Sequence, residues 1–336
     1  MMMRRTRARR APCLAGVLAL ATASPALPAA DTAEAHVAAA RAAAGSDYTS
    51  VFDDVCFPPA PAAAGTPAQA AAVQPATVAT PPRSAWHVEP VQVFDNLYYL
   101  GQSEFSAWAV RTSAGIIVID ALFEYSVEDE IVNGLSTLGL DPATIKYVIV
   151  SHAHRDHAAG ARLLQQRFGA HVIMSAADWD YMAADRQAWP KPRRDLIATD
   201  GEKLTLGDTT LTLYLTPGHT PGTVSTLIPV TDHGQRHVVA EWGGTGMEFR
   251  NFPDAKAYWF QTYSRSIQHF RAAANSAGAD VQIANHPNQD NAHAKLAALA
   301  KRRNADPHPF VIGAASVDRY LDMLDQCAQA GLARTR

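Results

Sequence analysis

The feature that most constrains this 336-residue chain is a group of metal-binding side chains placed directly after a strand-like segment. Residues 147–150 are apolar and mostly β-branched, which predicts a buried strand. Residues 151–157 then read Ser-His-Ala-His-Arg-Asp-His. In an extended segment alternate side chains point the same way, so His152 and His154 can converge on one ion. Asp156 and His157, at the turn into the next helix, can face a second ion, so the segment predicts two neighbouring metals.

Two further histidines stand in tight loops next to predicted strands. One loop, residues 216–220, reads Thr-Pro-Gly-His-Thr, and the other, residues 284–287, reads Ala-Asn-His-Pro. Proline and glycine fix the backbone of both loops, so we expect the imidazoles to be held rigidly, as metal ligands must be. Nitrogen and carboxylate ligands without a thiolate suit zinc, while iron and manganese stay compatible with the ligand types. The complete ligand set is His152, His154, Asp156, His157, His219 and His286.

Composition divides the chain into four parts. Residues 1–30 carry arginines without acids, then a short apolar stretch and small residues, which is the pattern of a secretory signal peptide. Residues 31–57 predict an N-terminal helical segment, and residues 58–85, rich in Ala and Pro, predict a flexible linker. Residues 86–336 are expected to form one domain. We therefore expect a periplasmic or secreted protein, exported by the general secretory route.

Removal of the leader leaves two cysteines, Cys56 and Cys327, in a compartment where disulfides persist. A bond between them would tie the N-terminal helical segment to the C-terminal helix. Two separate buried thiols are the alternative.

The charge and hydropathy of the chain exclude two classes of partner. The formal net charge is −3, which disfavours binding to the nucleic-acid backbone because that task needs Lys and Arg. No apolar stretch reaches the roughly 18 residues of a membrane span. We expect a small-molecule substrate, and the sequence predicts no oligomeric state.

Strands and helices alternate through the domain. Short strands are predicted between residues 91 and 120, and a helix over residues 126–138 leads to the strand before the metal-binding segment. A helix over residues 158–168 and further strands up to residue 240 follow. Three helices, over residues 254–277, 292–303 and 316–330, close the chain, with a strand at residues 281–284.

The sequence resembles the metallo-β-lactamase superfamily in three segments, which are His152-Ala-His154-Arg-Asp156-His157, Gly218-His219 and Asn285-His286-Pro287. The resemblance covers about residue 88 to the C-terminus. It implies an α/β fold built as a four-layer αβ/βα sandwich. Two mixed sheets would pack face to face with helices outside, and the metals would lie at the edge where strand-end loops meet.

Within the superfamily, the sequence is most similar to the third subclass of zinc β-lactamases, in which a histidine rather than a cysteine completes the second site. The resemblance implies two zinc ions per chain and makes residues 86–336 the catalytic domain. By this resemblance His152, His154 and His219 bind one zinc ion, and Asp156, His157 and His286 bind the other.

The resemblance also implies the chemistry. A hydroxide bridging two zinc ions would attack a carbonyl carbon, and the catalytic residue Asp156 would orient it and relay its proton. A β-lactam is the expected substrate of this exported hydrolase, which would make it an antibiotic-resistance enzyme. The alternative enzyme is a lactonase or another carboxylic ester or thioester hydrolase, and the non-enzymatic alternative is a zinc-binding protein.

Substrate contacts are expected from the loop that follows residues 237–240. The family's β-lactamases hold the drug's carboxylate there with serine hydroxyls or a lysine, and residues 240–247 contain neither. Thr245 can supply a hydroxyl, Arg250 a charge and Trp242 an apolar surface. The three glycines of the loop suit either close approach to a ligand or a tight turn. Glu241 is expected to be structural.

Aromatic side chains can form an apolar wall for the substrate, although core packing explains the same residues. Residues 188–192, Ala-Trp-Pro-Lys-Pro, predict an exposed loop that acts as a lid. The aromatic set is Phe123, Tyr125, Trp179, Tyr181, Trp189 and Trp242.

Overall fold

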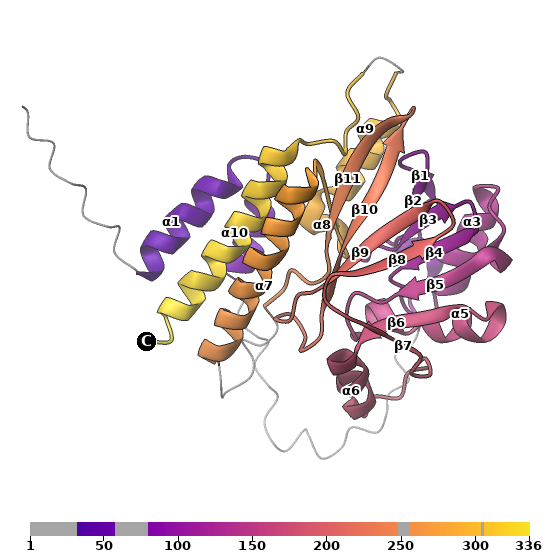
Figure 1. Cartoon of the computed structure of the whole chain (residues 1–336), viewed down its shortest axis with the longest axis horizontal. Helices are drawn as coiled ribbons and strands as arrows, with labels where there is room; N and C mark the ends of the chain where they lie inside the picture. Colours follow the sequence, from indigo (N-terminus) through magenta and orange to yellow (C-terminus); the bar gives the residue numbers. More distant parts are fainter. Residues whose placement is uncertain (1–31, 58–79, 248–255, 304–305) are drawn as a thin grey trace, which may run out of the picture. The chain divides into compact units, whose positions relative to one another are not determined.

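The computed structural model describes residues 32–57, 80–247, 256–303 and 306–336, and its strands form two mixed sheets (Figure 1). Strands β4 to β7 run parallel, as do β11 and β12, and the remaining neighbours are antiparallel. The seven-stranded sheet contains, in order, β1 (Val91–Gln92), β2 (Leu97–Tyr99), β3 (Trp108–Thr112), β4 (Gly115–Ile119), β5 (Ile145–Ile149), β6 (His171–Ser175) and β7 (Leu196–Ala198). The five-stranded sheet contains, in order, β12 (Val281–Ala284), β11 (Gln235–Trp242), β10 (Val224–Asp232), β9 (Thr209–Leu215) and β8 (Glu202–Leu206).

Both sheets are buried on both faces. Successive side chains of a strand point to opposite faces, so each strand supplies two hydrophobic layers. Along β4, Ile117 and Ile119 pack between the sheets, whereas Val118 packs beneath the outer helices. Along β11, Val239 packs between the sheets and Trp242 faces the helices on the other side. The expected four-layer αβ/βα sandwich is confirmed.

Helices cover the outer face of each sheet (Figure 1). The five-stranded sheet is covered by α1 (Ala33–Ala44), α2 (Thr49–Cys56), α7 (Lys256–Ala277) and α10 (Ala314–Ala333). The seven-stranded sheet is covered by the π-helical turn η3 (Glu128–Asn133), α3 (Gly134–Thr137), α4 (Arg155–Ala158), α5 (Ala161–Phe168) and α6 (Ala176–Ala184). The shorter elements are the 3-10 turns η2 (Arg83–Ala85) and η4 (Pro142–Thr144), and helices α8 (Pro287–Asp290) and α9 (Ala292–Leu299) after β12.

The loops that carry chemistry meet at one edge of the sandwich. The carboxyl ends of the parallel strands β4 and β5 lie side by side, because Asp120 donates its backbone N–H to the Ile149 carbonyl at 2.8 Å. The second sheet joins the same edge through Val224, whose N–H donates to the Ser151 carbonyl at 2.7 Å. Segments far apart in the sequence are therefore brought together where β5 ends.

Helices lie where the sequence predicted them, but some predicted helices are divided and their bounds differ. The predicted N-terminal helical segment is two helices, because the chain turns at Gly45, whose φ of 55° a glycine adopts without strain. These helices pack in the same unit as the other described residues. The helix predicted over residues 158–168 is divided into α4 and α5 at residues 159–160. The sequence did not predict α6, whose only clear signal is the Ser175 cap.

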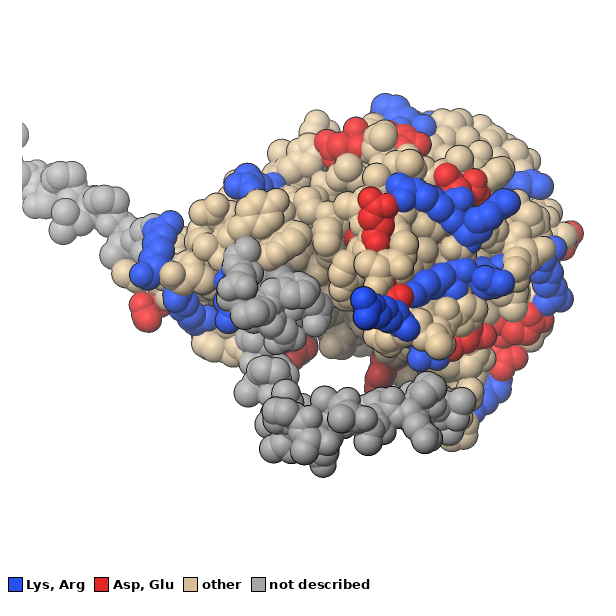
Figure 2. Space-filling model, turned by 90° about the horizontal axis from the view of Figure 1, so that it is seen from below, with Lys and Arg blue, Asp and Glu red and all other residues tan. Residues whose placement is uncertain are grey.

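Two predictions lie outside the described residues. They are the signal peptide at residues 1–30 and most of the predicted linker, residues 58–79. Within the described ranges, no helix has the length and apolar character that crossing a membrane requires. On the face shown in Figure 2, basic and acidic side chains are interspersed.

Cys56 on α2 and Cys327 on α10 form a disulfide, which decides against two separate thiols. The two residues are 271 positions apart in the sequence. Helices α1 and α2 also pack against α10, where Ala40 of α1 and Phe52 of α2 belong to the same hydrophobic cluster as Tyr320. The bond therefore fastens the N-terminal helices to the helical layer behind the five-stranded sheet.

Replacing both Cys56 and Cys327 by Ser should lower the thermal stability of the oxidised mature protein. A bond that closes so long a loop typically contributes about 2–4 kcal/mol by restricting the unfolded chain. We expect the Tm to fall by about 5–15 °C in a circular dichroism melt. The wild type in reductant is the matched control and should melt like the double variant. Equal Tm values for oxidised wild type and double variant would contradict this role.

Candidate metal centre

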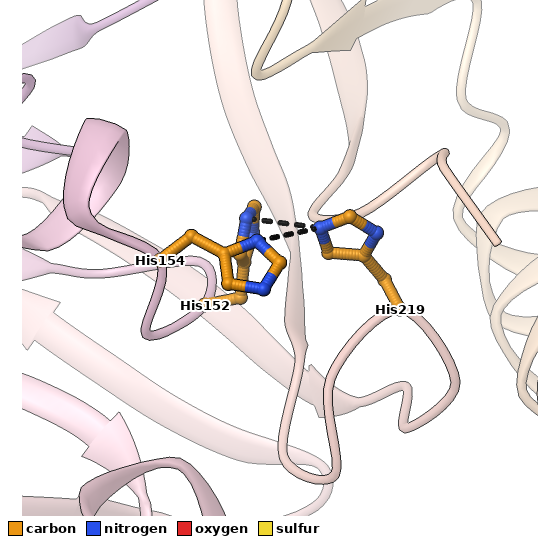
Figure 3. Close-up of side chains that lie close together, drawn as sticks. All are labelled: His152, His154 and His219. Carbon is orange, nitrogen blue, oxygen red and sulfur yellow. Dashed lines mark hydrogen bonds between the residues drawn. The ribbon is translucent and has the colours of Figure 1, made fainter. Parts of the chain in front are cut away.

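Three histidines from two loops bring one ring nitrogen each to a common point. His152 and His154 follow β5, and His219 lies in the loop between β9 and β10. The Nε2 atom of His219 lies 3.1 Å from Nε2 of His152 and 3.2 Å from Nδ1 of His154 (Figure 3). Three nitrogens within 4.8 Å of one another form a site that can hold one metal ion. We call these residues the first trio.

A second group of three side chains lies beside the first. Asp156 Oδ2 lies 3.1 Å from Nε2 of His157 and 3.9 Å from Nε2 of His286, and the two Nε2 atoms are 3.3 Å apart. We call these residues the second trio. The rings of His152 and His157 are 4.3 Å apart between centroids, so the two trios adjoin. The structure thus brings together all six residues that the sequence predicted as ligands.

Hydrogen bonds fix which nitrogen of four histidines faces the site. A carbonyl or carboxylate oxygen only accepts, so the Nδ1 atom opposite it carries a proton and Nε2 is the nitrogen that faces the metal site. The six side chains together offer imidazole nitrogens and one carboxylate, a set that fits zinc. The four bonds run from Nδ1 of His152 to the Gly243 carbonyl (2.8 Å), His219 to the Gly246 carbonyl (2.6 Å), His157 to Asp120 Oδ2 (2.8 Å) and His286 to the Glu104 carbonyl (2.9 Å).

Asp120 is a functional residue that the sequence reasoning missed. It follows β4 in a left-handed backbone conformation (φ 60°), which is uncommon for a residue other than glycine. Its Oδ1 accepts the N–H of Ser151 at 2.7 Å, and its Oδ2 accepts the Ser151 hydroxyl at 2.8 Å as well as the His157 ring. The available signal was its place at the carboxyl end of the apolar strand that precedes β5. Asp120 therefore fixes the start of the ligand segment and one ligand ring.

The electrostatics of the two trios differ. Burial, and then the neighbouring histidines, hold the pKa of His152 and His219 well below the usual range. Burial also lowers the pKa of His157, but the carboxylates of Asp156 and Asp120 outweigh it and raise that pKa to about 10. Burial raises the pKa of Asp156, but His157 outweighs burial and holds it below the usual range. In the metal-free protein at neutral pH, His157 is thus a cation between two carboxylates.

The glycines after β11 serve the ligand histidines. A Cβ atom on Gly244 would lie 2.5 Å from the Cβ of His219, and one on Gly243 would lie 1.9 Å from the Val224 carbonyl oxygen. Both distances are too short for any side chain. The two glycines therefore allow a close approach, but the segments approached are the His219 loop and the start of β10 in the protein itself, not a ligand.

Two of the predicted substrate contacts have buried side chains in this arrangement. Thr245 is buried and its hydroxyl lies 3.2 Å from the Tyr320 hydroxyl. Trp242 is fully buried and packs on Tyr263 and Phe270 of α7, on the face of the sheet opposite the other sheet. Both side chains are held by the helical layer. The third predicted contact, Arg250, lies outside the described residues.

Glu241, expected to be structural, is fully buried opposite Thr226 on the neighbouring strand. Burial raises its pKa well above the usual range. It belongs to neither trio.

The aromatic residues divide between core and site. Trp179, like Trp242, is a core residue, whose indole N–H donates to the Leu196 carbonyl at 2.8 Å. Tyr181 and Trp189 line a pocket of about 270 Å³ together with His154 of the first trio. Two of the six predicted aromatic residues thus border the first trio.

A second aromatic wall borders the second trio. The Phe105 ring lies 5.2 Å from the His286 ring and 5.0 Å from the Phe123 ring, which stacks on Tyr125 at 4.9 Å. Phe105, Phe123 and Tyr125 are all partly exposed. The sequence predicted two of these rings and missed Phe105.

The predicted lid, residues 188–192, borders the pocket beside His154. Its Trp189 is 6% exposed and donates its indole N–H to Asp185 Oδ2 at 2.6 Å, while Lys191 bonds the Asp185 carbonyl. The loop is therefore packed against the end of α6, and the Trp189 side chain is buried rather than exposed.

A family model and solved structures of known proteins both match this chain. The family model of the metallo-beta-lactamase superfamily matches residues 105–232, which include five of the six ligand positions. The solved structure of BJP-1, a subclass B3 metallo-β-lactamase of Bradyrhizobium japonicum, is similar with a TM-score of 0.61 and 26% identity, over 70% of this chain and 90% of that chain. A mutant metallo-β-lactamase from Cronobacter sakazakii (Enterobacter sakazakii) is 30% identical with a TM-score of 0.59, over 70% of this chain and 93% of that chain.

Curated relatives align over shorter regions. The N-acyl homoserine lactonase AttM of Azorhizobium caulinodans is 28% identical over 186 residues, which are 51% of this chain and 69% of that protein. The chain spans about a third to about two thirds of the length of the first curated relatives it matches, which also include a hydroxyacylglutathione hydrolase. Because the four-layer fold, the matched family model and 30% identity over nearly all of a solved relative agree, the chain belongs to the metallo-β-lactamase superfamily.

Proposed function

We propose that the protein is an exported dinuclear zinc hydrolase that opens an amide or ester carbonyl, with a β-lactam as the first candidate substrate. The observation that carries this proposal is the pair of adjoining trios, in which four histidines have their outer nitrogen held by an acceptor. A cluster of polar side chains that binds no metal would not need every Nε2 atom to face the same site. The likeness to solved metallo-β-lactamases supports the β-lactam substrate.

One zinc ion would be held by the first trio and one by the second. Zinc, when bound, acts as a Lewis acid towards a carbonyl oxygen and lowers the pKa of bound water to about 7, which supplies a nucleophile at neutral pH. Asp156 is ionised at neutral pH, since its pKa lies below the usual range. Its carboxylate can therefore accept a hydrogen bond from the attacking water and take up its proton, as a general base does.

A lactone or another ester is the second candidate substrate, and one observation favours it. β-Lactam drugs carry a carboxylate, but the described part of the loop after β11 contains no serine or lysine, and its Thr245 hydroxyl is buried against Tyr320. A neutral lactone needs no such anchor. The similarity to a lactonase supports this candidate as well.

Export is part of the proposal. The arginine-rich, then apolar, then small-residue pattern of residues 1–30 supports a cleaved signal peptide. The bond between Cys56 and Cys327 supports an oxidising compartment such as the periplasm.

The first test is a substrate panel on the purified mature protein. We expect about two zinc ions per chain by elemental analysis, and hydrolysis of nitrocefin or a carbapenem that a chelator abolishes and added zinc restores. An acyl-homoserine lactone in the same panel tests the second candidate. Lactone turnover without β-lactam turnover would replace the first candidate by the second, and no chelator-sensitive hydrolysis of any substrate would sink the proposed function.

Asp156→Asn should lower kcat by at least about 100-fold, because the amide cannot take up a proton in place of the carboxylate. The measurement is steady-state kinetics on the best substrate of the panel, with zinc content determined on the same sample. Asp208→Asn is the matched control, since Asp208 is an exposed carboxylate in the hairpin between β8 and β9. Full activity in Asp156→Asn would rule out the proposed role.

Zinc binding should release about one proton from the second trio and none from His152 or His219. At pH 7.5 the metal-free His157 is protonated, because its pKa is raised to about 10, and a ligand must be neutral. The pKa values of His152 and His219 lie well below 6.5, so these rings are already neutral. Titration calorimetry in buffers of different protonation enthalpy measures the number released. The release should fall to about half a proton at pH 10, where the metal-free His157 ring is half protonated, and a constant release up to that pH would contradict the assignment.

A further inference from the structure

Asp178 is a buried carboxylate that belongs to neither trio. It lies in the first turn of α6 and is 1% exposed. Its Oδ2 accepts the backbone N–H of Ala153 at 2.8 Å and the hydroxyl of Thr220 at 2.8 Å. Its Oδ1 accepts the backbone N–H of Gly222 at 2.7 Å. Both carboxylate oxygens are thus hydrogen-bonded to loops outside α6.

These partners stand next to the first trio in the sequence. Ala153 lies between His152 and His154, and Thr220 directly follows His219. One carboxylate therefore spans the two segments that supply all three ligands of the first trio. The described partners of the second trio are different, since His157 bonds Asp120 and His286 bonds the Glu104 carbonyl.

The helix context directs Asp178 towards the loops. Ser175 caps α6 by accepting the Asp178 N–H at 3.1 Å, which places Asp178 at the third helical position. An acidic residue there commonly turns back to the N–H of the cap residue, but both oxygens of Asp178 point to the ligand loops instead. The positive end of the helix favours a carboxylate at this place. Burial raises the pKa of Asp178 to about 6, so the carboxylate is ionised at neutral pH only because three donors compensate much of the cost.

The turn around Asp178 leaves no spare room. A Cβ atom on Gly222 would lie 1.9 Å from the Ser175 Oγ and 2.6 Å from the Asp178 nitrogen. The Thr220 hydroxyl also lies 2.8 Å from the Thr223 hydroxyl, so the loop that carries His219 is closed on itself. A shift of Asp178 would therefore be transmitted to the His219 loop.

We propose that Asp178 is a positioning residue for the first trio, holding the His152–His154 segment and the His219 loop at the spacing at which three imidazole nitrogens meet one zinc ion. This inference rests on the proposed function, because it presumes that the first trio binds zinc. Residues that orient metal ligands typically contribute 10–100-fold to metal affinity. Asp178 touches no ligand side chain directly and acts through the backbone of Ala153 and the side chain of Thr220.

The test is a zinc titration of the full mature protein against a competing chelator. The wild type should show two binding steps, which His219→Ala and His157→Ala assign to the first and second trio. Asp178→Asn should weaken the first-trio step by about 10–100-fold and leave the second-trio step within about threefold. Thr220→Val, which removes one of the three bonds, should weaken the same step by a smaller factor. Cobalt(II) bound at the first-trio step should show shifted absorption bands in Asp178→Asn.

Asp325→Asn is the matched control for the loss of a buried carboxylate. Asp325 lies between α7 and α10, where it accepts hydrogen bonds from Ser264 and from Gln268. It bonds to no segment that carries a ligand. We expect this variant to lower the Tm without changing either zinc step.

Three results would overturn the inference. They are an unchanged first-trio step in Asp178→Asn, equal weakening of both steps, and, where Asp178→Asn does not fold, an unchanged first-trio step in Thr220→Val. A wild type that binds no zinc would overturn the proposed function, and this inference with it. If the wild type shows two zinc-binding steps and Asp178→Asn changes neither, the proposed function would stand and only the role of Asp178 would be removed.

Discussion

The site depends on hydrogen bonds that hold the outer nitrogen of a ligand histidine. A free imidazole can rotate and can carry its proton on either nitrogen, so three rings on loops would rarely meet at one point. In four of the five ligand histidines, Nδ1 donates to an oxygen of another segment. The loops after β4 and β11 and the segment before β3 therefore matter for the metal centre although they supply no ligand. The fold as a whole serves to bring these acceptors to one edge.

The helical layer behind the five-stranded sheet belongs to the same support. The Tyr263 hydroxyl of α7 donates to the Thr245 carbonyl at 2.7 Å, and Tyr320 of α10 contacts the Thr245 hydroxyl. Both helices thus hold the loop whose carbonyls orient two rings of the first trio. The disulfide at Cys327 fastens α2 to the same helix α10. Helix α10 therefore contacts both the N-terminal helices and the loop that orients two rings of the first trio.

The sequence predicted the ligands better than their supports. Spacing after an apolar strand suffices for His152 and His154, because alternate side chains of an extended segment share a face. Asp120 and Asp178 were missed because their hydrogen-bond partners lie 25 or more positions away in the sequence, which leaves no local residue pattern. Trp242 was misplaced because β11 was predicted to end at residue 240, whereas the strand continues to Trp242 and its alternation turns that ring towards the helices. The sequence therefore predicts the ends of strands less well than their centres, because tertiary contacts determine where a strand ends.

The same loop shows why the substrate is harder to infer than the metal. The carbonyls of Gly243 and Gly246 are engaged by His152 and His219, and Tyr263 engages those of Gly244 and Thr245. A loop committed in this way to orienting ligands has few groups left to hold a substrate. Within the described residues, groups that can contact a substrate lie on the other walls, with Tyr181 beside the first trio and Phe105 beside the second. Selectivity should therefore follow from apolar shape on these walls more than from an anchor on the loop after β11.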